Sequence, residues 1–540
     1  MKTAFYNGKI YTGEETLKQA FLIEGGRIIR VGSDAEILSE AGSGSALHDL
    51  QGRFVCPGFN DSHMHLLNYG KVLGSANLFD HTDSLSGMIR YMKSFAASHP
   101  PKRGQWLFGR GWNQDLFRDV SRMPGKHDLD SISTAYPIVL TRACGHSCVV
   151  NSAVLQIAGI TSNSASPEGG AIGMEGGEPD GRLYDNAIEL LNPFIPLPGP
   201  DDLKEMIRSA AKSLNSYGIT SVQTDDYGVF RNIPKEAVNA AFRELEEAGE
   251  LTVRVYEQAN ILSVEELARF MDSGNGTGKG SDFFKIGPLK IVADGSLGSR
   301  TAFLSRPYAD LPENRGLLLL TEKELNELIS FANENDQQIA VHTIGDGCLD
   351  LVLEAFEKAL RDHPRRDHRH GVVHCQITRP DQLKKLRELD LCVYAQSVFL
   401  DYDNHIVEKR VGPVLASTSY SWKTLMESGV SVSNGSDCPV ELPDVMKGIE
   451  CAVTRTSMDG TGPYLPVEAF TVKEALDSFT IRGAEASFEE DRKGLIAPEY
   501  LADFTVLDEN PFESEPKELH KIRVHACYLG GRCVFERSGD

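Results

Sequence analysis

Two histidines separated by one residue, His63 and His65, are the residues of this chain best suited to bind a metal. They end an apolar run that begins at Phe54, which is typical of a buried strand. Because side chains alternate between the two faces of a strand, both imidazoles point the same way. Two imidazoles from one short segment suit a divalent transition metal such as zinc. The alternative is a pair of ordinary surface or core histidines.

Polar side chains also stand where four later apolar runs end. Lys290 lies in one of these runs, and His342, His374 and Asp437 each follow another. Each residue alone could be an ordinary hydrogen-bonded or turn-capping side chain. Their order on successive strand ends favours a common site, because the carboxyl ends of the strands converge on one face of a parallel barrel. Four histidines, an aspartate and a lysine on that face are metal-ligand chemistry.

The middle of the chain alternates apolar strands with amphipathic helices. Helical periodicity over 322–335 precedes the strand-like 338–342, and a second helical pattern over 349–360 precedes 371–374. Strands that alternate with helices imply βα units and a parallel sheet. The repetition predicts an α/β protein built on a distorted (β/α)8 barrel.

Both ends of the chain have the pattern of short strands and turns. Residues 3–56 contain Asn-Gly and Gly-Gly pairs between β-prone runs, which are hairpin signals, and residues 502–535 repeat the pattern. We therefore predict one small β domain assembled from residues 1–56 and 487–540, around a barrel formed by residues 57–486.

Residues from about 79 to 198 fit the barrel pattern less well and predict a large insertion after the first strand. Loops on the carboxyl face of a barrel usually build the substrate pocket. Trp112 and Tyr184 are therefore candidate pocket walls, although they could equally form the core of the insertion.

The bulk composition excludes some partners and compartments. The chain has 540 residues, 41% of them hydrophobic, and a net charge of −22, which argues against nucleic acid or an anionic membrane as partner. The N-terminus lacks the pattern of a signal peptide, and we see no apolar run long enough to span a bilayer. The ten cysteines are scattered, Cys144 and Cys148 included. They indicate reduced structural thiols and a cytoplasmic location.

The chain resembles the amidohydrolase superfamily of metal-dependent hydrolases, and within it the YtcJ-like branch that contains N-substituted formamide deformylases. The resemblance covers nearly the whole length and implies a distorted TIM barrel, a small β-sandwich built from both termini, and a homodimer. It rests on the motifs NGKIYTG, PGFNDSHMH, RACGHSCVVNSAVL, GITSVQTDD, KIVADGSLGSRTA, VHTIGD, VVHCQ, NGSDCPV and KGLIAPEYLADFTVLD.

The resemblance implies a role for each residue of the first metal site. His63 and His65 would bind the more buried metal, and Lys290 matches a lysine that is often carbamylated and bridges two metals. Lys285 lies on the same strand system and is the alternative lysine. Some relatives keep a single metal and need no carbamate, so we expect one or two divalent metals per chain, with zinc preferred.

The resemblance also implies the remaining roles. His342 and His374 would hold the second metal, with His374 close to the chemistry, and Asp437 would bind metal and act as general base. His146 would bind or polarise the substrate, or else would stabilise the insertion. Apart from the resemblance, Arg300 and Asp294 lie in a Gly-Ser loop after the Lys290 strand, and Arg300 would meet a substrate anion or, as we favour, would pair with Asp294.

Three functions compete. The leading hypothesis is hydrolysis of a linear amide of a small molecule, such as an N-substituted formamide or an N-acyl amine, by a metal-activated water. A mononuclear deaminase on the same scaffold usually adds a glutamate near the first lone histidine, but residues 343–346 contain none. A non-catalytic regulatory relative would have degraded ligands, and all six candidate ligands are present.

Overall fold

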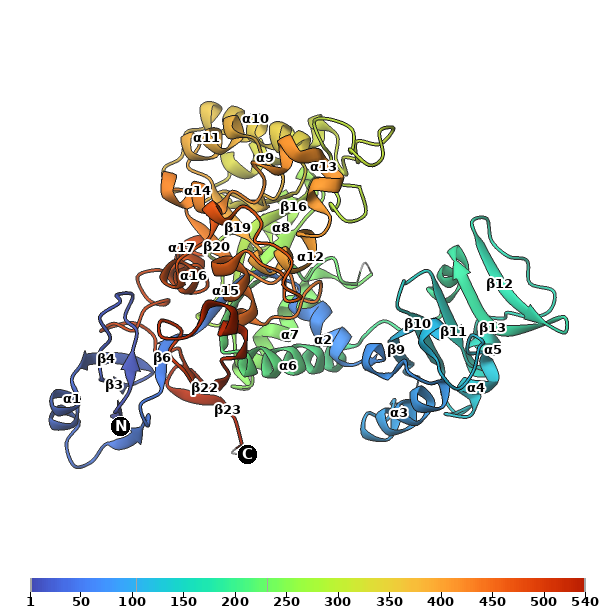
Figure 1. The fold of residues 1–540 in the computed structure, drawn as a ribbon, viewed down its shortest axis with the longest axis horizontal. Helices are drawn as coiled ribbons and strands as arrows, with labels where there is room; N and C mark the ends of the chain where they lie inside the picture. Colours follow the sequence, from blue (N-terminus) through green and yellow to red (C-terminus); the bar gives the residue numbers. More distant parts are fainter. Residues whose placement is uncertain (1, 103, 231, 539–540) are drawn as a thin grey trace. The chain divides into compact units, whose positions relative to one another are not determined.

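The structure is a computed structural model and describes residues 2–102, 104–230 and 232–538. The chain separates into two compact units, Met1–Tyr69 with Ile207–Asp540, and Gly70–Met206. Each unit has sheets and a hydrophobic core of its own, so the two are described in turn (Figure 1).

The larger unit contains an eight-stranded parallel barrel that is nearly closed, as the alternation of strands and helices predicts. In spatial order the strands are β20 (Val432–Asn434), β19 (Cys392–Ala395), β18 (Gly371–His374), β17 (Ile339–Thr343), β16 (Phe284–Val292), β15 (Arg254–Asn260), β14 (Ile219–Thr224) and β7 (Phe59–Met64). All neighbouring strands pair in parallel, so their carboxyl ends share one face.

Helices follow the strands and cover the barrel, because strands that are buried on both faces need helices on the outside. The main ones are α6 (Pro200–Ser216), α7 (Lys235–Glu247), α8 (Val264–Asp272), α9 (Glu322–Glu334), α10 (Asp346–Asp362), α11 (Pro380–Glu388), α14 (Trp422–Ser428) and α15 (Val445–Thr454). The helix predicted over 322–335 is α9, which begins with a capping box between Thr321 and Glu324.

The barrel closes where the first and last strands meet. The backbone N–H of Asp437 donates to the carbonyl of His63 at 2.8 Å, and the N–H of His65 donates to the carbonyl of Cys438 at 2.8 Å. These bonds join the HxH segment to the Asp437 loop, although residues 63 and 437 are far apart in the sequence. Barrel closure therefore brings two of the sequence motifs together.

The two ends of the chain form two further sheets, one of N-terminal strands alone and one in which strands from both ends lie side by side (Figure 1). One has the order β4 (Arg27–Gly32), β3 (Ala20–Glu24), β1 (Thr3–Tyr6) and β5 (Ala46–Asp49); the other has β2 (Lys9–Ile10), β6 (Phe54–Pro57), β21 (Phe504–Leu507), β22 (Val524–Leu529) and β23 (Arg532–Glu536). Phe5 and Phe21 stack at 5.0 Å, and both meet Phe504 edge to face. Aromatic burial of this kind fixes the two sheets on a common core.

The unit Gly70–Met206 has a six-stranded sheet of its own, with the order β12 (Gly170–Glu175), β13 (Glu178–Asp185), β11 (Ser147–Val150), β10 (Ile138–Arg142), β9 (Leu107–Trp112) and β8 (Ala76–Asn77). Helix α3 (Leu85–Ser98) packs Met88 and Met92 into the same core as Trp112. The part of the chain that interrupts the βα pattern is therefore an ordered α/β unit rather than a set of loops.

Among the described residues, no helix is both long enough and apolar enough to cross a bilayer.

Candidate metal centre

The carboxyl ends of the barrel strands carry the six predicted ligands. They are His63 in β7, His65 directly after it, Lys290 in β16, His342 in β17, His374 at the end of β18, and Asp437 after β20. Lys290 and His63 are each only 1% exposed, and His374 is 2% exposed. The strand ends thus gather ionisable groups, and three of the six are almost fully buried.

Three of these side chains converge on one point. The ligand atoms of His63, His374 and Asp437 all lie within 4.8 Å of one another. The Nε2 atoms of His63 and His65 lie 3.4 and 3.1 Å from Asp437 Oδ1. That buried oxygen nevertheless has no aligned hydrogen-bond donor. A buried carboxylate oxygen without a donor is costly, and a cation among these imidazoles would satisfy it. The donor set therefore fits a divalent metal.

His342 and His374 define a second point of convergence. Nδ1 of His342 lies 3.0 Å from Nε2 of His374. The other nitrogen of His342, Nε2, lies 3.3 Å from the carbonyl oxygen of Gly295 and 3.6 Å from Oδ1 of Asp294. Because both of those neighbours are acceptors, Nε2 carries the proton and Nδ1 offers a lone pair. The two rings thus suit a second cation.

The protonation preferences of the imidazoles follow from their surroundings. Burial holds the pKa of His63 and His342 well below the ordinary range and lowers the pKa of His374 to about 4, so these three are neutral ligands. Burial also acts on His65, but the Asp437 carboxylate outweighs it and raises its pKa to about 9. Although burial alone would raise the pKa of Asp437, nearby His65 and His63 hold it below its ordinary value.

The structure distinguishes the two candidate lysines on β16. Lys290 Nζ lies 3.6 Å from Oδ2 of Asp225, and both side chains are buried. Lys285 lies nearer the start of the strand, where its Nζ donates to Glu489 at 2.6 Å. Lys290 is therefore the lysine at the histidine cluster.

The backbone is strained at two of the predicted ligands. His374 and Asp437 have φ angles of 75° and 55°, in the left-handed region that non-glycine residues seldom adopt. Such conformations cost about 1–3 kcal/mol each and persist where the surrounding structure enforces them, often at functional sites. Gly435 allows the close approach of the Asp437 loop, because a Cβ there would lie 2.6 Å from the backbone nitrogen of His63.

Asp61 fixes that loop against the HxH segment. Its Oδ1 accepts from the backbone N–H groups of His63 at 3.2 Å and Ser436 at 3.0 Å, and its Oδ2 accepts from Ser436 Oγ at 2.5 Å. Burial raises the pKa of Asp61 to about 7. Asp61 therefore holds the two segments of the site together through its hydrogen bonds to His63 and Ser436.

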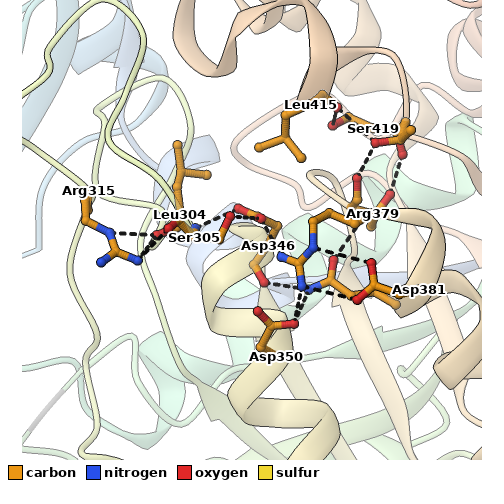
Figure 2. A network of polar contacts seen from close by, with 12 residues as sticks. Leu304, Ser305, Arg315, Asp346, Asp350, Arg379, Asp381, Leu415 and Ser419 are labelled. Carbon is orange, nitrogen blue, oxygen red and sulfur yellow. Dashed lines mark hydrogen bonds and ion pairs between the residues drawn. The ribbon is translucent and has the colours of Figure 1, made fainter.

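A polar network holds the loop that follows the Lys290 strand. Figure 2 shows the Arg379 guanidinium facing three carboxylates, and it donates to Asp346 at 2.6 Å and to Asp350 at 2.5 Å. Asp346 begins α10 and also accepts from the backbone N–H of Ser305 at 2.9 Å. The loop is thereby tied to the start of the helix that follows the His342 strand.

Comparison with known proteins places the chain in a family. A family model for the amidohydrolase family matches residues 46–535. The chain is 32% identical over 547 residues to the protein named amidohydrolase YtcJ of Bacillus subtilis (strain 168), with 100% of both chains covered. This protein belongs to the amidohydrolase family.

Two further relatives agree with that assignment. The amidohydrolase is 26% identical over 553 residues to the N-substituted formamide deformylase of Arthrobacter pascens, with 99% of this chain and 98% of that protein covered. It matches the crystal structure of an uncharacterized metal-dependent hydrolase from Pyrococcus furiosus with a TM-score of 0.78 and 29% identity, over 95% of this chain and 100% of that one. The protein is a hydrolase of the amidohydrolase superfamily, as the sequence motifs predict.

Four further predicted residues of this amidohydrolase are not among the six ligands. His146 and Tyr184 belong to the unit Gly70–Met206, where exposed His146 pairs with Asp185 at 3.0 Å and Tyr184 donates to Met123 Sδ at 3.7 Å. Trp112 is fully buried in the core of that unit, which is the structural alternative that the sequence left open.

Arg300, the fourth of these residues, has a different partner from the one that the sequence suggests. It forms two hydrogen bonds to Asp310, at 3.1 and 2.9 Å. Asp294 is fully buried and instead accepts from the backbone N–H groups of Ile344, Gly345 and Phe303. The predicted Arg300–Asp294 pair was therefore wrong, because the Asp294 carboxylate accepts hydrogen bonds from three backbone N–H groups instead.

Sequence reasoning missed three residues that contact the cluster. Asp225 accepts from His65 Nδ1 through its backbone carbonyl at 2.8 Å, and the side chains of Gln258 and Gln396 lie 2.7 Å from His63 and His374. All three stand within or just after apolar strands, which is the signal that identified the ligands. The signal predicts proximity to the site but not which atom a side chain faces.

Proposed function

We propose that this amidohydrolase hydrolyses a linear carbon–nitrogen amide bond of a small molecule, of the N-substituted formamide or N-acyl amine type, with a divalent metal, zinc by preference. The observation that carries the proposal is the convergence of histidine nitrogens on the donor-free oxygen of Asp437. The full-length similarity to a relative named N-substituted formamide deformylase supports the bond type.

The chemistry follows from the positions of the chain's own groups. His63, His65 and Asp437 would hold a divalent metal, which would supply Lewis acidity to acidify water and polarise a carbonyl. Asp437 Oδ1, 3.1 Å from His65, is the group placed to take a proton from the attacking water and to deliver it to the leaving nitrogen. Neutral His63 and His374 hold their lone pairs toward the same point.

We propose further that His342 and His374 would hold a second metal, and that Lys290 would serve both metals as a ligand after carbamylation. In that reaction the Lys290 amine adds carbon dioxide, forms a new N–C bond and releases a proton. The resulting carbamate is an anion beside the Asp225 carboxylate, which lies 3.6 Å from Lys290 Nζ. Because two buried anions repel each other, we expect the carbamate and the metals to be acquired together.

The test is a panel of N-alkyl and N-aryl formamides and N-acetyl amines, assayed by release of the free amine. The metal-reconstituted protein should hydrolyse at least one class, and a chelator should abolish the activity. Asp437→Asn should keep the fold and lower turnover by about 10²–10⁴-fold, the range for loss of a general base. Hydrolysis of amino-substituted ring substrates with release of ammonia, and no hydrolysis of the amides, would overturn the amide proposal in favour of a deaminase.

A further inference from the structure

Two fully buried glutamines contact the two most buried imidazoles of the site. Oε1 of Gln258, on β15, lies 2.7 Å from Nδ1 of His63. Oε1 of Gln396, directly after β19, lies 2.7 Å from Nδ1 of His374. Both glutamines have an exposed fraction of 0%, so water does not compete for these contacts. The same pairing therefore occurs twice, from two separate strands of the barrel.

The hydrogen bond from the amide nitrogen fixes the orientation of each glutamine side chain. Nε2 of Gln258 donates to the carbonyl oxygen of Ser62 at 3.1 Å, and Nε2 of Gln396 donates to the carbonyl oxygen of Tyr394 at 2.9 Å. A flipped amide would place its oxygen against that carbonyl oxygen and lose a buried hydrogen bond. The amide oxygen of each glutamine must therefore face the imidazole.

A fixed amide oxygen determines the tautomer of the histidine. An amide oxygen only accepts, so Nδ1 of His63 and Nδ1 of His374 must each carry the proton. The lone pair of each ring is then on Nε2. These Nε2 atoms are the ones directed at the cluster, 3.4 Å from Asp437 Oδ1 for His63 and 3.0 Å from His342 Nδ1 for His374.

We propose that Gln258 and Gln396 are positioning residues of the metal centre, which hold His63 and His374 in the Nδ1–H tautomer and direct their Nε2 lone pairs at the cation. The proposal rests on the proposed function in one respect, that the cluster binds metal. Partners of this kind usually change metal affinity by about 10–100-fold when they are removed.

The choice of an amide also sets the charge of the site. His65 meets the backbone carbonyl of Asp225, so three of the four imidazoles have a neutral oxygen as acceptor on the side away from the cluster. His342 meets the carbonyl of Gly295 at 3.3 Å and also lies 3.6 Å from the Asp294 carboxylate. A carboxylate in place of either glutamine amide would add a buried negative charge and would make the imidazole a stronger donor to the metal. Neutral partners therefore hold the rings while leaving the cation more electrophilic.

The experiment measures the zinc Kd by competition with a chromophoric chelator. Gln258→Leu and Gln396→Leu remove the acceptor and should each raise the Kd about 10–100-fold. Gln258→Glu and Gln396→Glu keep an acceptor and should bind zinc at least as tightly as the wild type. Thermal melting of the metal-free variants confirms that each one folds.

Gln338→Leu is the matched control. Gln338 precedes β17 and is fully buried, and its Nε2 donates to the carbonyls of Arg369 and Ala486 at 2.8 Å each. Losing it should cost folding stability as much as losing the other glutamines, yet leave the zinc Kd unchanged. An equal loss of affinity in this control would show that the effect is general destabilisation, and would overturn the proposal.

Nitrogen NMR of ¹⁵N-histidine protein gives a readout that is independent of affinity. The wild type should show protonated Nδ1 for His63 and His374 in the metal-free protein, and the leucine variants should show mixed tautomers. If the wild type binds zinc and the leucine variants bind it equally well with unchanged tautomers, the positioning role is wrong while the proposed function stands. A wild type that binds no zinc would overturn both.

Discussion

The two ends of one strand, β16, use lysine in opposite ways. Near its start, Lys285 donates to Glu489 at 2.6 Å; near its end, Lys290 lies 3.6 Å from Asp225 beside four histidines. Because parallel strands share a direction, the two lysines belong to opposite ends of the barrel. The comparison separates charges that stabilise the fold from charges that are placed for chemistry.

At the amino end of the barrel, buried charges are paired with one another. Glu489 contacts both Lys285 and Lys493, and Lys493 also donates to Ser221 Oγ at 2.8 Å. Arg254 forms two hydrogen bonds to Asp503, at 2.6 and 3.0 Å. These ion pairs join the barrel to residues near the C-terminus. Because the charged groups bind one another, they are poorly suited to bind a ligand.

At the carboxyl end of the barrel, the buried groups point toward a common region instead of forming ion pairs with one another. Asp437 Oδ1 lies within 3.4 Å of two imidazoles without an aligned donor, and the lone pairs of His342 and His374 face each other at 3.0 Å. Such an arrangement costs stability in the metal-free protein, which is the expected signature of a site whose groups serve an external cation.

The largest expected effect is loss of metal at the carboxyl end. His65→Ala removes a ligand, so the bound metal and the amide hydrolysis should both disappear. The variant should nevertheless melt at nearly the same temperature as the metal-free wild type. Metal analysis and calorimetry measure the two quantities. Activity that persists in metal-free buffer would contradict the proposed mechanism.

The next effect is on folding, at the amino end. Glu489→Gln leaves Lys493 and Lys285 without their carboxylate, and breaking a buried pair in this way typically costs about 3–5 kcal/mol. Denaturant unfolding should show this loss, while the metal content per chain stays at the wild-type value. A Glu489→Gln protein that is as stable as the wild type but binds less metal would contradict the proposed difference in role between the two ends of the barrel.

The ion pairs of Glu489 should also make the free energy of unfolding depend on pH in the acid range. Burial alone would raise the pKa of Glu489, but Lys493 and Lys285 lower it to about 2 from an ordinary value of 4.5. A depressed folded-state pKa gives stability that is present above pH 4.5 and is lost as the pH falls toward 2. The stability difference between wild type and Glu489→Gln should therefore shrink over that interval. A constant difference would mean that Glu489 does not titrate there.

The smallest effect is expected at Arg300. Its pair with Asp310 is exposed to solvent, which screens the attraction, so Arg300→Ala should leave the free energy of unfolding nearly unchanged. Hydrolysis of neutral and anionic amides should stay within twofold of wild type. A selective loss with anionic amides would instead place Arg300 at the substrate, the alternative that the sequence left open.

The sequence predicted the barrel and its ligand-bearing strand ends because both have strong local signals. Alternating strands and helices identify βα units, and a polar residue at the end of a buried run identifies the face that strand ends share. His63 and Asp437 could thus be assigned to one site without knowledge of the contacts between them.

The partners of the ligands could not be predicted in the same way. Whether Arg300 meets Asp294 or Asp310 depends on the path of one loop, and Asp294 is satisfied by backbone donors that no spacing reveals. Gln258 and Gln396 resemble any buried polar strand residue until their hydrogen bonds are known. The strands of the Gly70–Met206 unit were not predicted either, because some of them follow one another directly and so lack the regular alternation with helices that identified the barrel.

The most direct test of the central claim compares the two lysines of β16. Metal content per chain and unfolding free energy are measured for wild type, Lys290→Ala and Lys285→Ala. We expect Lys290→Ala to lose one metal equivalent, and Lys285→Ala to keep its metal and to lose about 2 kcal/mol, the scale of a hydrogen bond to a charged group. Equal metal content in all three proteins would contradict a metal-bridging Lys290 and the division of roles between the two ends.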